Sequence, residues 1–140
     1  MVEETLIFEP IDVVLEDFEL IPYVRMTKRT MHIDKYAKRY LSMFTAGRAR
    51  LLESLEKSTY PKYGEFYIPE KTPFLACIYV FTNLRLHRCD MDNLVKSALD
   101  MSQSVIFPND NQIDAIVSSR HPAEGRPPML RMIYSPWIGW

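Results

Sequence analysis

Residues 74–82 read FLACIYVFT, an almost unbroken apolar run of nine residues. A strand buried on both faces has this composition, whereas a strand with one solvent face alternates apolar and polar residues. Turn-forming residues precede the run at 69–73 (PEKTP), and a polar stretch follows it at 83–89 (NLRLHRC). The run therefore predicts a central strand over 74–82.

Helical periodicity is found on both sides of this strand. Upstream, apolar residues recur at spacings of three and four and predict a helix over 35–57, with Asp34 as its N-cap. Downstream, the same spacing predicts a second helix that is capped by Asp90 or Asp92 and ends before Val105. The central strand thus lies between two helices along the chain.

Four further stretches are rich in β-branched and aromatic residues and predict strands, with prolines at 10 and 22 placing edges, ends or bulges in the first two. These stretches are residues 5–15, 18–27, 113–119 and 129–134. A loop at 124–128 makes the last two a predicted hairpin. The order of elements indicates an α/β fold of the α+β type, in which a small mixed sheet packs against two main helices.

A chain of 140 residues with 47% apolar content is expected to form a single domain over 1–140. It would include an acidic segment at 1–20 and an aromatic tail at 136–140, whose tryptophans we expect to pack on the core. The sequence has no apolar run long enough to span a bilayer, and it does not begin like a signal peptide. We therefore expect a cytoplasmic protein in which Cys77 and Cys89 are free thiols.

The net charge of -1 hides an uneven distribution. Residues 1–20 hold seven acidic residues and no lysine or arginine, whereas residues 23–50 hold eight basic residues and one acidic residue. The basic stretch could follow a phosphate backbone, or it could be a solvated face balanced by the acidic segment. The candidate DNA-binding residues are Arg25, Lys28, Arg29, Lys35, Lys38, Arg39 and Arg88.

Acidic residues gather where the central strand leads into the second helix. Asp90 and Asp92 are two apart, so both carboxylates can face one pocket, and oxygen ligands of this kind suit a hard cation such as Mg²⁺. Lys96 lies one helical turn after Asp92, where its ammonium could meet a phosphate. Spacing alone also fits two helix caps and an ordinary acid–base pair, and Asp110 could simply form a turn. Both interpretations stay open on spacing alone.

The stretch DMDNLVKSALD at 90–100, followed by FPNDNQI at 107–113, resembles the RusA family of Holliday-junction resolvases (crossover junction endodeoxyribonucleases). That family shows Asp-x-Asp-Asn-Leu-x-Lys and, after a helix, an acidic pair with Gln. The resemblance covers roughly residues 20 to 135 and implies that Asp90, Asp92, Asp110 and Lys96 are catalytic. It also implies that the three aspartates bind Mg²⁺, for which Mn²⁺ substitutes, and that Asn93 and Gln112 support the site.

The same resemblance implies a homodimeric nuclease, often encoded by a bacteriophage, that cuts opposing strands of a four-way DNA junction in recombination and repair. Two departures accompany it: the dense basic run before the first aspartate is reduced, and the acidic pair is Asn109-Asp110. A nuclease of broader specificity for flaps, forks and Y-junctions stays an alternative. So does a protein that binds junctions without cutting them.

Overall fold

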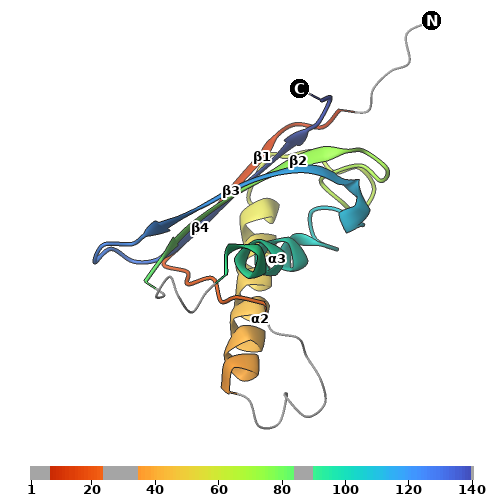
Figure 1. The fold of residues 1–140 in the computed structure, drawn as a ribbon. Coiled ribbons are helices and arrows are strands. Elements are labelled where there is room, and N and C mark those ends of the chain that lie inside the picture. The colour runs from red at the N-terminus through yellow and green to blue at the C-terminus, as the bar shows by residue number, and fades with distance from the viewer. Residues whose placement is uncertain (1–6, 24–34, 84–89, 140) are drawn as a thin grey trace, which may run out of the picture.

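The computed structural model describes residues 7–23, 35–83 and 90–139. In this part of the chain a mixed four-stranded sheet packs against two helices (Figure 1). The elements are β1 (Ile11–Glu16), α2 (Lys35–Glu56), β2 (Phe74–Thr82), α3 (Met91–Ser102), the 3₁₀ helix η2 (Asp110–Gln112), β3 (Ile113–Pro122) and β4 (Met129–Pro136). The predicted α+β class, with a mixed sheet and two main helices, is confirmed.

Strand β2 occupies an inner position in the sheet, whose order is β1-β4-β2-β3. It pairs antiparallel with β4 and parallel with β3. Its even-numbered residues Phe74, Ala76, Ile78 and Val80 are fully buried, and the alternate residues are half-buried. The prediction of a central strand at 74–82, which was made from the apolar run, is therefore confirmed.

The predicted hairpin at the end of the chain is wrong. Both strands form, but β2 lies between β3 and β4 and pairs with each of them. The loop at 124–128 therefore connects two strands that are not neighbours. Since β2 and β3 are parallel, the chain between them has to cross a face of the sheet, and it does so as α3.

The two strands predicted near the N-terminus fare differently. The first is confirmed in part, as β1 begins at Ile11, directly after Pro10. Residues 18–23 form no strand, because their hydrogen bonds go elsewhere: the Ser97 hydroxyl donates to the Ile21 carbonyl (2.7 Å), and the Tyr23 amide donates to the Asn93 carbonyl (3.0 Å). This segment therefore lies against α3. Residues 24–27, and the predicted cap Asp34, lie outside the described residues.

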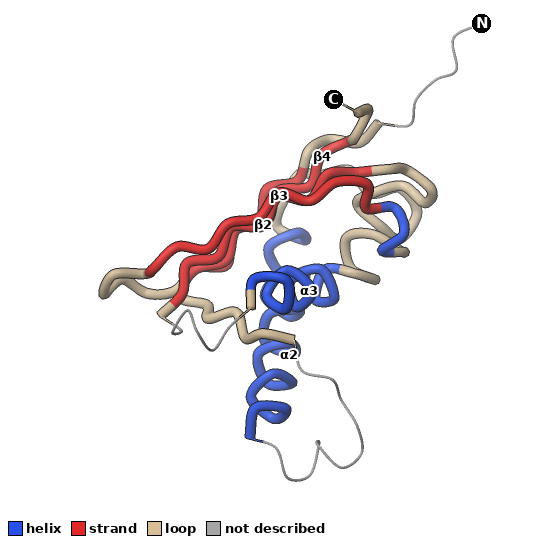
Figure 2. Tube along the Cα trace, viewed as in Figure 1, coloured by secondary structure: helices blue, strands red, loops and turns tan. Residues whose placement is uncertain are grey.

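Both helices lie on one face of the sheet, so the core is a single layer between them and the strands (Figure 2). Its aromatic centre is formed by Phe74, Phe107 and Tyr134, whose ring centroids are 4.9 to 5.9 Å apart. The buried Tyr134 hydroxyl donates to the Ser102 hydroxyl (2.7 Å), which joins the sheet to the end of α3. Trp137 is half-buried and its amide donates to the Pro73 carbonyl (3.3 Å), whereas Trp140 lies outside the described residues.

Gly47 of α2 packs closely against the core. A Cβ atom at this position would lie 2.7 Å from Cζ of Phe18 and closer still to Sδ of Met101. We expect Gly47→Ala to lower the free energy of unfolding by about 1–2 kcal/mol, because overpacking outweighs the gain in helix propensity. Urea unfolding measures this, with the exposed Ala46→Ser as the control. A more stable Gly47→Ala variant would contradict the close packing described here.

Candidate active site

A groove of about 860 Å³ runs between α3 and the edge strand β3. Its apolar lining comes from both elements and includes Leu99 and the exposed Ile116. Its charged residues are Asp92, Lys96, Asp100 and Asp110. Three aspartates and one lysine therefore line a single cavity.

Helix α3 presents three of these charged side chains because they are spaced by four residues. Asp92, Lys96 and Asp100 follow one another at successive turns, so they lie on one face of the helix. The opposite face carries Leu94 and Ala98, which are fully buried against the sheet. Amphipathicity thus fixes the rotation of α3 and directs the charged face into the groove.

Asp110 is delivered by η2, at the entrance to β3. The Asn109 carboxamide caps this turn by accepting from the Asn111 amide (3.0 Å). The buried Gln112 donates from Nε2 to the carbonyls of Pro69 (2.8 Å) and Thr72 (3.0 Å). Gln112 therefore anchors η2 to the loop before β2, and the Asp110 side chain is exposed.

Asp90 occupies the N-cap position of α3, but its carboxylate makes no capping hydrogen bond. It is exposed and is not among the residues that line the groove. Asp92 is two helical turns from Asp100, about 12 Å along the helix axis. Within the described ranges, no three His, Cys, Asp or Glu side chains converge closely enough to hold a metal ion. The structure thus brings Asp92, Lys96 and Asp110 to one groove without closing the predicted three-aspartate cluster.

Asp100 is a groove residue that the sequence analysis did not single out. Burial raises the pKa of its carboxyl, the Lys96 ammonium lowers it, and the Asp110 carboxylate raises it again. The carboxylates of Asp100 and Asp110 therefore interact electrostatically. The spacing of four after Lys96 was the signal that could have found it. A donor set of hard oxygens with more negative than positive charge fits a hard divalent cation.

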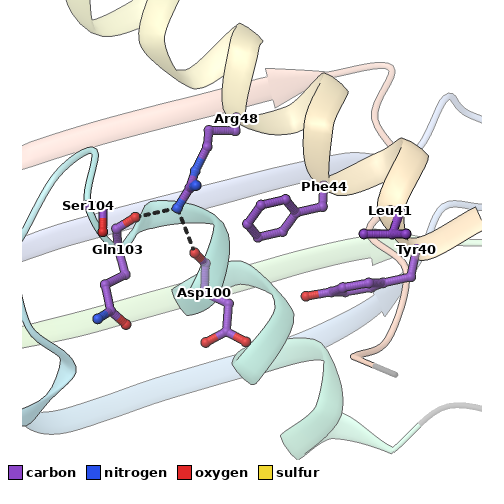
Figure 3. Close-up of a pocket in the computed structure, with 7 residues that line it drawn as sticks. All are labelled: Tyr40, Leu41, Phe44, Arg48, Asp100, Gln103 and Ser104. Atoms are coloured by element: carbon purple, nitrogen blue, oxygen red, sulfur yellow. Dashed lines mark hydrogen bonds between the residues drawn. The ribbon is translucent and has the colours of Figure 1, made fainter. Parts of the chain in front are cut away.

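Arg48 of α2 fixes the end of α3 that carries Asp100. Its Nη2 donates to the carbonyls of Asp100 (3.3 Å) and Gln103 (2.5 Å), and its Nε donates to the Met101 carbonyl (3.4 Å). A cation near the last carbonyls of a helix also complements the helix dipole. Figure 3 shows the Asp100 carboxylate on the far side of its backbone from this guanidinium. Arg48 therefore donates its hydrogen bonds to backbone carbonyls at the helix terminus, and its charge also lowers the pKa of the Asp100 carboxyl.

Three of the predicted DNA-binding residues can be placed. Lys35, Lys38 and Arg39 are exposed in the first turns of α2, at the end of the helix that projects away from the sheet (Figure 1). The other four predicted contacts lie outside the described residues: Arg25, Lys28, Arg29 and Arg88.

The groove lies in a segment of the chain that matches a known protein family. A family model described as Endodeoxyribonuclease RusA matches residues 58–129, slightly more than half of the chain. The chain belongs to the RusA family of endodeoxyribonucleases. Every charged residue of the groove lies inside the matched segment.

Membership of the RusA family implies a hydrolase that acts on branched DNA junctions. No curated protein matches the sequence. None of the helices in the described part of the chain is long and apolar enough to cross a membrane.

The burial of Asp100 predicts a pH-dependent cost to stability. A carboxyl whose pKa is raised by folding contributes stability that is present at acid pH and is lost as the pH rises through the folded-state pKa. We therefore expect Asp100→Asn to raise the melting temperature of the metal-free protein at pH 7 and to have a smaller effect near pH 3.5. The exposed Asp114→Asn is the control, and an equal effect at both pH values would contradict the cost of burial.

Proposed function

We propose that this chain is a Mg²⁺-dependent endodeoxyribonuclease that hydrolyses phosphodiester bonds in branched DNA, with four-way junctions as its main substrate. The observation that carries the proposal is the gathering of Asp92, Asp110 and Lys96 in one groove within the segment that matches the RusA family. A bare DNA-binding surface has no need of carboxylates, because they repel phosphate.

The proposed metal ligands are the carboxylates of Asp92 and Asp110, with Asp90 at the start of α3. Asp100 adds a further carboxylate to the residues that line the groove. Mg²⁺ bound there would supply a water of lowered pKa and would neutralise charge on the scissile phosphate. The carboxylates would also influence how the phosphate lies. Any carboxylate without a bound metal ion repels the phosphate oxygens and keeps them at a distance.

Lys96 is the cation that the chain itself brings to the reaction. Lys96 is exposed and lines the groove, so its ammonium can reach a non-bridging phosphate oxygen and donate hydrogen bonds to it as negative charge develops there. The basic start of α2 would bind the phosphate backbone away from the scissile bond. Lys35, Lys38 and Arg39 are placed for this by their exposure at the projecting end of the helix.

We further propose that the enzyme acts as a homodimer. Each chain offers one groove, and paired incision of a four-way junction requires two. The edge strand β3 exposes the apolar side chain of Val117, which is not among the residues that line the groove, and this supports its use as part of a subunit contact. Light scattering at several protein concentrations tests the oligomeric state.

The proposal predicts the loss of DNA cleavage when the groove carboxylates are neutralised. We expect Asp92→Asn and Asp110→Asn each to slow cleavage of a synthetic four-way junction by at least about a hundredfold in Mg²⁺. Lys96→Gln is expected to cost on the order of a hundredfold, because it removes a donor to the developing charge. Single-turnover rates on a labelled junction measure all three, with Asp114→Asn as the matched exposed control.

Three substrates and a chelator distinguish the alternatives. Faster cutting of flaps or forks than of four-way junctions would favour a nuclease of broader specificity. Tight junction binding without cutting in Mg²⁺ or Mn²⁺ would favour a binding protein. Full activity of Asp92→Asn, or of the wild type in chelator, would contradict the metal-dependent mechanism.

The basic start of α2 predicts a salt-dependent affinity. Neutralising Lys35, Lys38 and Arg39 together to glutamine should make the plot of log affinity against log salt shallower by roughly 2 to 3, since each lost phosphate contact removes a slope of about 0.9. The control neutralises Lys57, Lys62 and Lys71, which are exposed at and beyond the other end of α2. Equal slopes for the two triple variants would remove this helix from the DNA-binding surface.

A further inference from the structure

We infer that Tyr23 is a positioning residue that holds the ammonium of Lys96, a residue that lines the groove, on the face of its aromatic ring. The inference rests on the proposed function, because it assigns a partner to a lysine whose role in cleavage is itself proposed. Tyr23 lies outside the segment that matches the RusA family and outside the motif that contains Lys96.

The contact is close and has the geometry of a cation–π interaction. The Lys96 Nζ atom lies 4.0 Å from the centroid of the Tyr23 ring. An ammonium within about 6 Å of a ring centroid is attracted by the negative face of the ring. The Tyr23 amide donates to the carbonyl of Asn93, one turn before Lys96 on the same helix (3.0 Å). Backbone and side chain of Tyr23 are therefore both tied to the α3 turn that carries the lysine.

The Tyr23 ring also contacts α2. The rings of Tyr23 and Tyr40 form a T-shaped pair with centroids 5.8 Å apart, and Tyr40 packs in turn on Phe44, with ring centroids 6.0 Å apart. The Arg48 guanidinium lies over Phe44, 4.8 Å from the centroid, and its hydrogen bonds close the end of α3 (Figure 3). This aromatic column, Tyr23, Tyr40 and Phe44, has a cation at each end and keeps the Tyr23 ring in place.

A lysine at this position needs such a partner because of its neighbours. Asp92 and Asp100 lie one turn before and one turn after Lys96, so each carboxylate is within reach of its flexible side chain. Either ion pair would draw the ammonium along the helix and would neutralise a carboxylate proposed to bind metal. The Tyr23 ring attracts the ammonium without an ion pair, so both carboxylates keep their negative charge.

The test compares substitutions that keep or remove the π face. We expect Tyr23→Leu to lower kcat for junction cleavage about fivefold to tenfold with little change in KM, because the ammonium is no longer held for the transition state. Tyr23→Phe keeps the face and should restore the rate to within about twofold of the wild type. Tyr79→Leu, on the sheet face away from the helices, is the matched control. Equal kcat values for Tyr23→Leu and Tyr23→Phe would overturn the inference.

Fluorination separates the cation–π contact from simple packing. Phenylalanine with one, two or three fluorines at position 23 keeps the ring shape and progressively weakens the negative face. The expected result is a stepwise fall in kcat at an unchanged melting temperature. A flat series would overturn the inference even if Tyr23→Leu failed to fold.

A double-mutant cycle with Lys96→Gln distinguishes this inference from the proposed function. If Lys96→Gln is slow and Tyr23→Leu slows it no further, the two residues act together as inferred. If Tyr23→Leu has its full effect in the Lys96→Gln background, Tyr23 acts independently and the inference is wrong. If Lys96→Gln is as fast as the wild type, the proposed role of Lys96 fails, and the positioning role fails with it.

Discussion

The parallel pairing of β2 with β3 is the constraint on which the rest of the structure depends. Adjacent parallel strands cannot be joined by a tight turn, so the chain leaves β2, crosses one face of the sheet as α3 and returns through η2. The crossover lays α3 beside β3, and the groove is the space between the two. Because β4 pairs with the other side of β2, β3 stays at the edge of the sheet and the groove stays open to solvent. The connection that the topology demands is thus the same segment that carries the groove acids.

Helix α2 contributes to the groove without lining it. Helix α3 ends at Ser102 and the next residue, Gln103, is extended, so the last carbonyls of the helix need donors from elsewhere. Arg48 supplies them, and Phe44 beneath its guanidinium begins the aromatic column that reaches Tyr23. The column is well shielded: burial raises the pKa of the Tyr40 hydroxyl to about 12, and the nearby Asp100 carboxylate adds to the rise. Both ends of α3 are therefore positioned by contacts with α2 and with the segment before it.

Local patterns predicted the elements well, and non-local pairing limited the rest. The apolar run at 74–82 and the two helical stripes depend on burial and periodicity, which are readable from neighbouring residues, and all three elements form as predicted. The hairpin prediction was wrong because the alternation of apolar and polar residues in β3 and β4 does not show that β2 lies between them. The strand predicted at 18–27 failed over residues 18–23 because their hydrogen-bond partners on α3 are distant in sequence. The motif located the groove, but the raised pKa of Asp100 and the place of Tyr23 depend on packing that spacing does not reveal.

The arrangement of charge along the groove explains why an aromatic ring, rather than an acid, is the better partner for Lys96. Lys96 lies between Asp92 and Asp100 on one face of α3. If its ammonium paired with either carboxylate, it would neutralise that carboxylate, and its N–H donors would bind the carboxylate instead of the phosphate. A ring face attracts the ammonium yet accepts no strong hydrogen bond, so the N–H donors of Lys96 stay available. The carboxylates then keep their negative charge for the proposed divalent cation, and the ammonium keeps its N–H donors for the phosphate of the proposed substrate. Separating the two kinds of charge on one short helix requires a third group, and Tyr23 supplies it from outside the motif.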